Sequence, residues 1–404
     1  MISPDYNSDY FFMCYAPSIV PVFSLFGQNY LLAEFGMIMR TSWIEIRRSA
    51  FFHNIDWYVH TLGSTRVAVV IKANAYGHGL ESIAQLCEEH ISVAWLCTAS
   101  LSEAIRVRLS DVQKPILVLA TLDDDIAHAA HYDIDLAVHA MEEARMINER
   151  AHYAQKKINV HVKIDTGLSR FGFAYDTAVD DVLTVASLPY INVRGIYTHC
   201  AESGGMDHAF VHEQQQRFEH IRNALHACGF IAPLYHMAKS TVAAQFPATR
   251  YDLVRIGAGA YGLCARDIGT LQQVMSWKAR IMHVRTVIAG ATIGYNRTYT
   301  ARTDMRIAVV PIGYYEGYPA TLSNKGVVRI VRTGHLIPVV GRVCMNQILC
   351  DVSQIADVTQ ADEVELIGAH EGITIPDIVE RLGGGNEREL VVRLNPLLER
   401  CIVP

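Results

Sequence analysis

The chain has 404 residues, of which 50% are hydrophobic and 19% are charged. This length is ample for two domains with buried cores. The 35 Lys and Arg residues against 41 Asp and Glu residues give a formal net charge of −6 at pH 7, which argues against a nucleic-acid-binding protein because such proteins need a concentrated basic surface.

The first forty residues differ in composition from the rest. The first 39 contain no Lys or Arg and are rich in aromatic and aliphatic residues, which is one feature of a signal peptide or membrane anchor. However, Asp5 and Asp9 stand where a signal peptide needs positive charge, and Pro17 and Pro21 interrupt the apolar stretch. We therefore predict a poorly ordered extension over residues 1–40 and no membrane association.

From Trp43 to about residue 260, short runs rich in β-branched residues alternate with amphipathic helical stretches. The eight runs are 66–72, 93–98, 115–119, 135–138, 159–164, 191–197, 234–237 and 253–256. This alternation is typical of repeated βα units, and eight parallel strands close into a barrel. We predict an α/β fold with a (β/α)8 TIM-type barrel over residues 41–264.

The pattern changes after Gly262. A linker is predicted at 265–273, and a short helix near 376–381; the triple glycine at 383–385 is predicted to be a loop. The strand-like runs are 276–287, 306–311, 326–332, 337–343 and 347–352, with turn residues but no helical stretches between them. This pattern predicts a mostly β C-terminal domain over residues 265–404.

The nine cysteines are spread through apolar surroundings, and none forms a C-x-x-C pair. This distribution indicates reduced core thiols and is unlike a disulfide framework or a zinc site. We expect a cytoplasmic protein without a bound metal.

The first run of the barrel ends in a lysine, Lys72, where active sites of this architecture are built. A buried ammonium group has a lowered pKa, which frees the amine to form a Schiff base. Considered without its neighbours, Lys72 is better explained as a lysine at a strand end whose charged group reaches water.

The complete string VIKANAYGHG at 70–79 supports the chemical interpretation. It resembles the pyridoxal-phosphate lysine motif of the alanine racemase family, and the resemblance extends from about Trp43 to at least Val352. It implies that Lys72 binds pyridoxal 5'-phosphate covalently and is one of two acid/base groups. It also implies that Tyr76 contacts the cofactor phosphate.

The string KIDTGLSRFG at 163–172 matches another signature of this family. Arg170 takes the position of an arginine near the cofactor's phenolic oxygen and the substrate carboxylate, a role that suits a permanently charged guanidinium group. The alternative for Arg170 is a surface salt bridge. Lys163 lies where some members carry a carbamylated lysine that holds this arginine.

Two further strand ends match the family. In YTHCA at 197–201, His199 corresponds to a histidine that packs on the pyridine ring. In HMAKS at 236–240, Ser240 corresponds to a phosphate ligand at a helix N-terminus. The family usually has Asn where this chain has Lys239, which either adds positive charge near the phosphate or points outward.

The last strand carries DLVRIGAG at 252–259. Arg255 matches an arginine that faces the pyridine nitrogen and leaves it unprotonated, which suits racemisation. The alternative is that Arg255 simply pairs with Asp252. Gly257 and Ala258 are expected to offer backbone amides to the phosphate.

The second domain contains IGYNRTYT, GYYEGY and GRVCMNQ, at 293–300, 313–318 and 341–347. All three resemble signatures of the family's β domain. The resemblance assigns Tyr295 as the second catalytic group, reaching the active site of the partner subunit in a homodimer. Tyr314 and Met345 are expected to line the shared substrate entrance.

The resemblance implies a pyridoxal-phosphate-dependent alanine racemase that interconverts L-alanine and D-alanine by a two-base mechanism and supplies D-alanine for peptidoglycan. Two departures leave a racemase for another amino acid, or a broad-specificity one, as alternatives. Asn346 stands where the family often has Asp, and residues 389–396 lack a tyrosine that many members use on the phosphate, with Val391 or Val392 at its approximate place. A non-catalytic pyridoxal-phosphate barrel would normally lack the β domain, and a decarboxylase would usually have glutamate where Arg255 stands.

Overall fold

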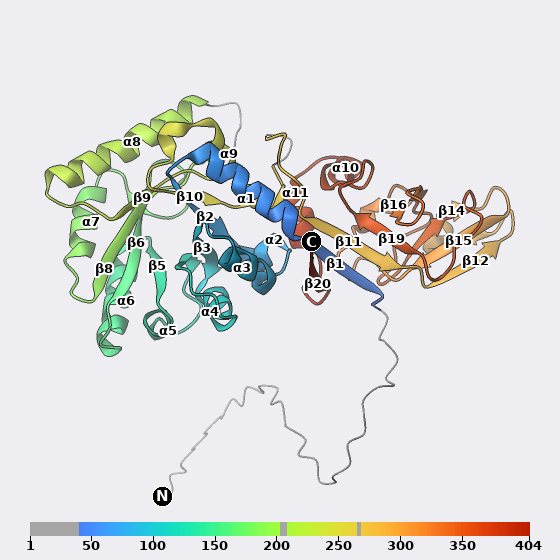
Figure 1. The fold of residues 1–404 in the computed structure, drawn as a ribbon, viewed down its shortest axis with the longest axis horizontal. Coiled ribbons are helices and arrows are strands. Elements are labelled where there is room, and N and C mark those ends of the chain that lie inside the picture. The colour runs from blue at the N-terminus through green and yellow to red at the C-terminus, as the bar shows by residue number, and fades with distance from the viewer. Residues whose placement is uncertain (1–39, 203–207, 265–267) are drawn as a thin grey trace, which may run out of the picture. The chain divides into compact units, whose positions relative to one another are not determined.

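The computed structural model describes residues 40–202, 208–264 and 268–404. The extension predicted over residues 1–40 therefore lies outside the described residues, apart from Arg40. The described chain contains a barrel followed by sheets of the second domain (Figure 1).

Eight parallel strands form the barrel. They are β2 (Arg66–Val70), β3 (Val93–Ser100), β4 (Ile116–Thr121), β5 (Ile134–Val138), β6 (Ile158–Asp165), β8 (Ile191–Tyr197), β9 (Leu234–His236) and β10 (Leu253–Ile256). Strands β2 to β9 pair in chain order and β10 pairs with β2, while a single bridge joins Lys239, which follows β9, to Arg255 of β10. All eight predicted runs are thus strands, which confirms the predicted barrel.

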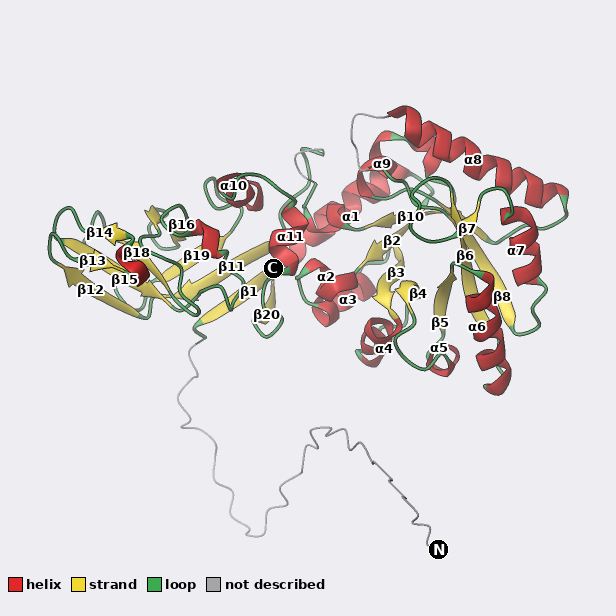
Figure 2. Ribbon diagram, turned by 180° about the vertical axis from the view of Figure 1, so that it is seen from behind, coloured by secondary structure: helices red, strands yellow, loops and turns green. Residues whose placement is uncertain are grey.

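Helices cover the outside of this barrel (Figure 2). They are α1 (Arg48–Leu62), α3 (Leu80–Glu89), α4 (Leu101–Leu109), α5 (Ala127–His131), α6 (Met141–Tyr153), α7 (Ala178–Ala186), α8 (His208–Ala227) and α9 (Ser240–Gln245). In α3 the buried residues include Leu80, Ile83, Ala84 and Cys87, whose spacing forms one apolar stripe. Ser100 begins α4 by accepting a hydrogen bond from the Glu103 N–H, which satisfies an amide left without a partner at the helix start.

Side chains of the barrel strands alternate between two cores. In β2, Val67 and Val69 belong to the large core between strands and helices, whereas Ala68 and Val70 belong to a small apolar cluster inside the barrel. The same alternation places buried polar side chains inside the barrel in several other strands, β5, β6, β9 and β10 among them. For example, Arg255 lies between Val254 and Ile256, which both belong to the outer core.

The second domain is built around a six-stranded sheet with the order β17-β16-β19-β11-β1-β20. Its strands are β1 (Ser42–Arg47), β11 (Met275–Arg280), β16 (Val327–Ile330), β17 (Leu336–Pro338), β19 (Glu363–Ile367) and β20 (Glu399–Val403). Two smaller sheets contain β12 (His283–Val287), β15 (Met305–Val310) and β18 (Ile348–Asp351), and β13 (Thr292–Ile293) with β14 (Tyr299–Thr300). The helices α10 (Ile375–Arg381) and α11 (Glu387–Val392) precede the last strand.

The structure differs from the prediction at the start of the barrel region. Strand β1 lies within the predicted barrel range 41–264, yet it pairs with β11 and β20 of the second sheet. The physical reason is that eight strands already close the barrel, so it has no free edge for a ninth parallel strand. The predicted run 276–287 is two strands, β11 and β12, and the sequence did not predict β19, β20 or α11.

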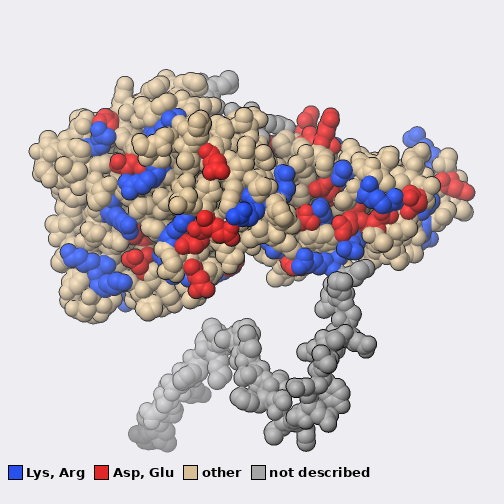
Figure 3. Space-filling view, in the orientation of Figure 1, with Lys and Arg blue, Asp and Glu red and all other residues tan. Residues whose placement is uncertain are grey.

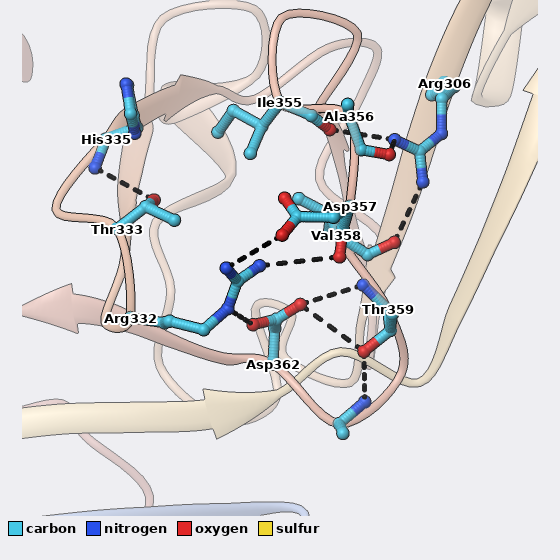
Figure 4. Close-up of polar contacts among 11 residues, drawn as sticks. Arg306, Arg332, Thr333, His335, Ile355, Ala356, Asp357, Val358, Thr359 and Asp362 are labelled. Carbon is cyan, nitrogen blue, oxygen red and sulfur yellow. Dashed lines mark hydrogen bonds and ion pairs between the residues drawn. The ribbon is translucent and has the colours of Figure 1, made fainter.

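Arginine side chains tie together the loops of the second domain (Figure 4). Arg332 forms ion pairs with Asp357 at 3.1 Å and with Asp362 at 2.8 Å. Arg306 donates to the carbonyls of Ile355 and Val358 at 2.8 Å and 2.9 Å. These contacts hold residues 355–362 against β15 and the segment that follows β16, with Asp357 exposed and Asp362 buried.

Charges of both signs are interspersed on the face that Figure 3 shows, without a large patch of one sign. Within the described ranges, no helix is both long enough and apolar enough to cross a membrane.

Candidate active site

A cavity of about 360 Å³ opens at the C-terminal ends of the barrel strands. Nine residues that the sequence predicted for the site line it: Lys72, Tyr76, Lys163, Arg170, His199, Ser240, Arg255, Gly257 and Ala258. They lie on or directly after five different strands, β2, β6, β8, β9 and β10. The barrel thus gathers side chains that are up to 186 residues apart in the sequence (258 − 72).

Lys72 follows β2 directly, and its side chain is mostly buried beside the cavity. Burial lowers the pKa of its ammonium group, and the positive charge of Arg170 lowers it further, while Glu103 partly opposes both. A lowered pKa raises the fraction of neutral amine, the form that attacks a carbonyl carbon. The site therefore favours covalent attachment of an aldehyde at Lys72.

The backbone after Lys72 is left-handed. Four consecutive residues have φ angles between 51° and 55°: Ala73, Asn74, Ala75 and Tyr76. This conformation costs roughly 1–2 kcal/mol for each residue with a Cβ atom. Glu103 accepts a hydrogen bond from the Ala73 N–H at 2.7 Å, and the Asn74 side chain accepts one from the Leu80 N–H at 2.9 Å. These contacts stabilise a turn that carries Tyr76 into the cavity wall.

Tyr76, Ser240 and the turn after β10 form one side of the cavity. The Ser240 hydroxyl accepts hydrogen bonds from the N–H groups of Gly257 and Gly259, at 3.1 Å and 3.2 Å. A Cβ atom at Gly257 would lie 2.5 Å from the Tyr76 hydroxyl, so only glycine allows this approach. Burial raises the pKa of Tyr76 to about 12, which keeps the phenol protonated as a hydrogen-bond donor.

Lys163 lies at the opposite wall, 4% exposed. Burial lowers its pKa to about 8, and the positive charges of Arg170 and Arg255 act in the same direction. Its ammonium nitrogen lies 5.3 Å from the centre of the Phe171 ring and 5.9 Å from that of Tyr197. A substantial fraction of its amine is therefore neutral near physiological pH.

Arg255 is buried and does not pair with Asp252. Its guanidinium group donates to the Thr198 carbonyl at 2.8 Å, to the Met237 carbonyl at 3.0 Å and to a ring nitrogen of His236. Asp252 instead accepts from a backbone N–H. The alternative of a simple Arg255–Asp252 ion pair is therefore wrong.

A chain of hydrogen bonds runs from Arg255 through the barrel interior. His236 Nε2 lies 2.8 Å from His161 Nδ1, and His161 Nε2 lies 3.2 Å from Asp135, which Arg194 contacts at 3.2 Å. Arginine can only donate, so His236 must accept at Nδ1 and carry its proton on Nε2. His161 then carries its proton on Nε2 and donates to the carboxylate. None of these residues was predicted from the sequence, although a polar residue within an otherwise apolar strand was a usable signal.

His199 lies beside this chain, with Nδ1 3.3 Å from the Arg255 guanidinium group. Burial lowers the pKa of His199 well below its ordinary value, and Arg255 and Lys239 add to that effect. The imidazole is therefore neutral, as expected for a ring that packs on another ring.

The predicted site residues of the second domain do not line this cavity. Tyr295 is 69% exposed, Tyr314 49% and Met345 55%. The three motifs that carry these residues contact one another. The Tyr314 N–H donates to the Cys344 carbonyl at 3.1 Å. A Cβ atom at Gly341 would lie 2.9 Å from the carbonyl oxygen of Ile293, so these two backbones are also close. Within one chain, the structure thus shows a buried barrel site and a separate exposed group of predicted site residues.

Comparison with known proteins identifies the family. The model of the alanine racemase N-terminal domain matches residues 46–265, and that of the alanine racemase C-terminal domain matches residues 274–402. The chain belongs to the alanine racemase family. An alanine racemase of Desulforamulus reducens is 38% identical over 349 residues, which cover 84% of this chain and 93% of that protein.

Solved structures of this family agree with the fold. An alanine racemase of Clostridium difficile 630 is 29% identical, covers 91% of this chain and 97% of its own, and has a TM-score of 0.83. An alanine racemase of Bartonella henselae with covalently bound pyridoxal phosphate is 23% identical, covers 90% of this chain and 100% of its own, and shares the fold with a TM-score of 0.77. The family depends on pyridoxal phosphate.

Three departures from the family motifs can now be placed. Lys239 lines the cavity and donates to the Cys200 carbonyl at 3.0 Å, so it does not point outward. Asn346 donates to the Glu316 carboxylate at 2.7 Å, where an aspartate would be repelled. Arg388 of α11 also lines the cavity, and the sequence analysis did not select it because it lies over 120 residues beyond the last barrel strand.

Proposed function

We propose that this protein interconverts L-alanine and D-alanine, with pyridoxal 5'-phosphate bound at Lys72 and a shared site in a homodimer. One observation carries the proposal: a mostly buried lysine with a lowered pKa lies in a cavity whose other walls hold eight residues at family motif positions. The activity of the relatives, all alanine racemases, supports it.

The cavity fits pyridoxal phosphate. Tyr197 lines it, and the buried hydroxyl of this residue has no hydrogen-bond partner among the described residues, as expected where a bound molecule completes the site. Tyr76, Ser240, Gly257 and Ala258 would hold the phosphate group, where the glycine permits close approach. When bound, the cofactor supplies an electron-withdrawing ring that acidifies the Cα proton of an attached amino acid.

Arg255 sets the strength of that electron withdrawal. A guanidinium group has no acceptor and does not give up its proton readily, so a ring nitrogen facing it stays unprotonated. The carbonyls of Thr198 and Met237 and the ring of His236 fix its orientation. Weaker withdrawal favours rapid return of the proton to Cα over side reactions, as racemisation requires.

Arg170 is proposed to hold the substrate carboxylate and to be oriented by Lys163. Both residues line the cavity, and the lowered pKa of Lys163 supports its reaction with CO2 to a carbamate, because only a neutral amine reacts. The carbamate would replace a positive charge beside Arg170 with a negative one. A carboxylate-like group there would stabilise the guanidinium of Arg170.

Racemisation requires a proton to leave one face of Cα and to arrive at the other. Lys72 Nζ would hold the proton on one face, and the phenol of Tyr295 of the partner subunit would hold it on the other. The exposure of Tyr295, Tyr314 and Met345 supports this arrangement, since each is free to enter a second copy of the chain. A homodimer would therefore contain two complete sites.

A cytoplasmic location and a supply of D-alanine for peptidoglycan are further parts of the proposal. In the part of the chain that the structure describes, no cysteine lies in a disulfide, which supports a reducing compartment. The substitution at Asn346 leaves other small amino acids as competing substrates.

The test is racemisation of a panel of L-amino acids by the full chain with added pyridoxal phosphate, followed by the loss of optical activity. We expect alanine to react fastest. If serine or lysine reacts faster, that amino acid and not alanine is the preferred substrate. If no amino acid reacts, the proposed function is wrong.

A further inference from the structure

Arg388 lies at the phosphate side of the cavity although it comes from the second domain. It lines the same cavity as Tyr76, Ser240, Gly257 and Ala258. The family motif in this stretch has a tyrosine that contacts the phosphate, and the sequence analysis placed Val391 or Val392 at that position. Neither valine lines the cavity, whereas Arg388 does.

The position of Arg388 is defined by the packing of α11 against the turn after Lys72. A Cβ atom at Gly77 would lie 2.1 Å from the Val391 carbonyl oxygen, so the two backbones are in close contact. Leu390 and Val391 are buried, and Asn386 accepts a hydrogen bond from the Arg388 N–H at 3.1 Å. Strand β20 holds the same turn in place, since its Arg400 donates two hydrogen bonds to the Gly77 carbonyl, at 3.2 Å and 3.1 Å.

The charges around the cavity favour an anion. The described residues that line it include six Lys or Arg and no Asp or Glu; the basic residues are Lys72, Lys163, Arg170, Lys239, Arg255 and Arg388. Arg388 is close enough to lower the pKa of the Tyr76 phenol and that of the Lys239 ammonium group by its charge, in each case as a smaller effect than burial. Arg388 Nη2 lies 3.8 Å from Cys264 Sγ, a weak contact.

We propose that Arg388 is a phosphate ligand of the cofactor site and replaces the family's C-terminal tyrosine with a charged group. This inference rests on the proposed function, because it assumes that pyridoxal phosphate binds at Lys72. A tyrosine offers one neutral hydrogen bond, whereas a guanidinium group offers two parallel, charge-assisted bonds to a phosphate dianion. Lys239, on the same side of the cavity, adds a second positive charge.

The test compares two aldehydes that differ only in the phosphate group. Cofactor-free full-length protein is titrated with pyridoxal 5'-phosphate or with pyridoxal, and the absorbance of the lysine-linked form measures the affinity. For Arg388→Ala we expect the affinity for pyridoxal phosphate to fall roughly 10- to 100-fold, the usual range for one hydrogen bond to a charged group. The affinity for pyridoxal should change less than about threefold, because no phosphate contact is lost.

Two variants separate charge from structure. Arg388→Gln keeps the length of the side chain without its charge and should resemble Arg388→Ala in this ratio, while Arg388→Lys should keep part of the preference. Arg393→Ala is the matched control, because Arg393 directly follows α11 and is exposed to solvent, where it pairs with Glu389. Melting temperatures of all variants report any loss of α11 packing.

The outcomes distinguish this inference from the proposed function. If the unaltered protein links neither aldehyde, the proposed function is wrong and the inference falls with it. If it links both, and both the Ala and Gln variants lose affinity for the two aldehydes equally or not at all, only the role of Arg388 is refuted. If inorganic phosphate competes with pyridoxal phosphate less strongly in Arg388→Gln than in the unaltered protein, the role of Arg388 as a phosphate ligand is supported.

Discussion

The barrel cavity and the exposed group of the second domain carry the two halves of one predicted chemistry in opposite physical settings. In the barrel, burial and neighbouring charges lower the pKa values of Lys72, Lys163 and His199. In the second domain, Tyr295 and Met345 are more than half exposed; Tyr295 begins a short 3-10 turn between β13 and β14, and Met345 lies on a loop before β18. Burial within one chain thus lowers the pKa values of the barrel residues, whereas the role proposed for the exposed group depends on a second chain that would remove it from water.

The largest expected effect tests the barrel half. Lys72→Ala removes the amine that we propose binds the cofactor and moves a proton, so racemisation should fall by about 10⁴-fold or more. Absorbance of the lysine-linked cofactor should disappear, while circular dichroism shows an intact barrel. Borohydride reduction of the unaltered protein should label Lys72, and labelling of another lysine would contradict the assignment. Lys157→Ala, at an exposed position of the barrel, is the control.

The second prediction tests the exposed half. Tyr295→Phe removes only a hydroxyl group and should slow proton transfer by about 10²- to 10⁴-fold. The loss should be much larger for one enantiomer than for the other, and we expect the L-substrate to suffer more. Cofactor affinity should be unchanged, since Tyr295 does not line the cavity of its own chain. Progress curves started from each enantiomer measure the asymmetry.

Mixing the two inactive variants tests whether the barrel site and Tyr295 act together across two subunits. Random exchange of Lys72→Ala and Tyr295→Phe subunits should restore about a quarter of the normal activity, because half of the dimers are mixed and each contains one intact site. A preparation that forms mixed dimers and stays inactive would place both residues in one chain. The double variant mixed with Lys72→Ala is the control that should remain inactive.

A third prediction concerns reaction outcome. Arg255→Glu would place a carboxylate against the ring nitrogen, favour its protonation and strengthen electron withdrawal. Racemisation should slow by about tenfold or more while transamination per turnover rises. Product analysis by chromatography of pyruvate and D-alanine measures this partition. An unchanged partition would contradict the role proposed for Arg255.

A smaller effect is expected at the other end of the hydrogen-bond chain from Arg255. In the unaltered protein, ¹⁵N NMR should show His236 and His161 as neutral rings protonated at Nε2. Asp135→Asn keeps an acceptor for His161 and should preserve both tautomers, whereas Asp135→Leu removes the acceptor and should disturb them. If protonation at Nδ1 of His236 were observed in the unaltered protein, the direction of the chain would be wrong.

The smallest expected effect is the pH dependence of stability. The pKa of Lys163 is about 8 in the folded protein, against an ordinary value of 10.5. Between these values the unfolded chain retains a proton that the folded chain has lost, so the free energy of unfolding should rise with pH across this window. Below about pH 8 the folded protein carries a buried positive charge, which destabilises it.

Replacing this lysine tests that sign. Lys163→Met should raise the melting temperature of the cofactor-free protein at pH 7 in CO2-free buffer and reduce its increase between about pH 8 and pH 10.5. Lys157→Met is the exposed control. A melting temperature that falls at pH 7, with the rise at alkaline pH intact, would show that Lys163 is stabilised as a cation.

The barrel and most of the residues around its cavity were predictable from the sequence. Strands such as β6 and β10 were predictable because apolar runs and helical stretches alternate locally, and parallel strands must present their C-terminal ends at one rim. The placement of Lys72 and Arg255 at this rim was predictable for the same reason, since each lies at or near the end of such a run. Their roles, and the choice of Arg170, were implied only by the resemblance of the surrounding motifs to a family.

Contacts between distant segments were not predictable from the sequence and became visible in the folded chain. Strand β1 has no local signal for its partner β11, more than 220 residues later, and their pairing depends on a barrel that is already closed. Arg388 reaches the cavity because α11 packs on the turn at Gly77. The physical reason is that periodicity along the chain reports which face of an element is buried, whereas the choice of what covers that face depends on shape and charge across the whole fold.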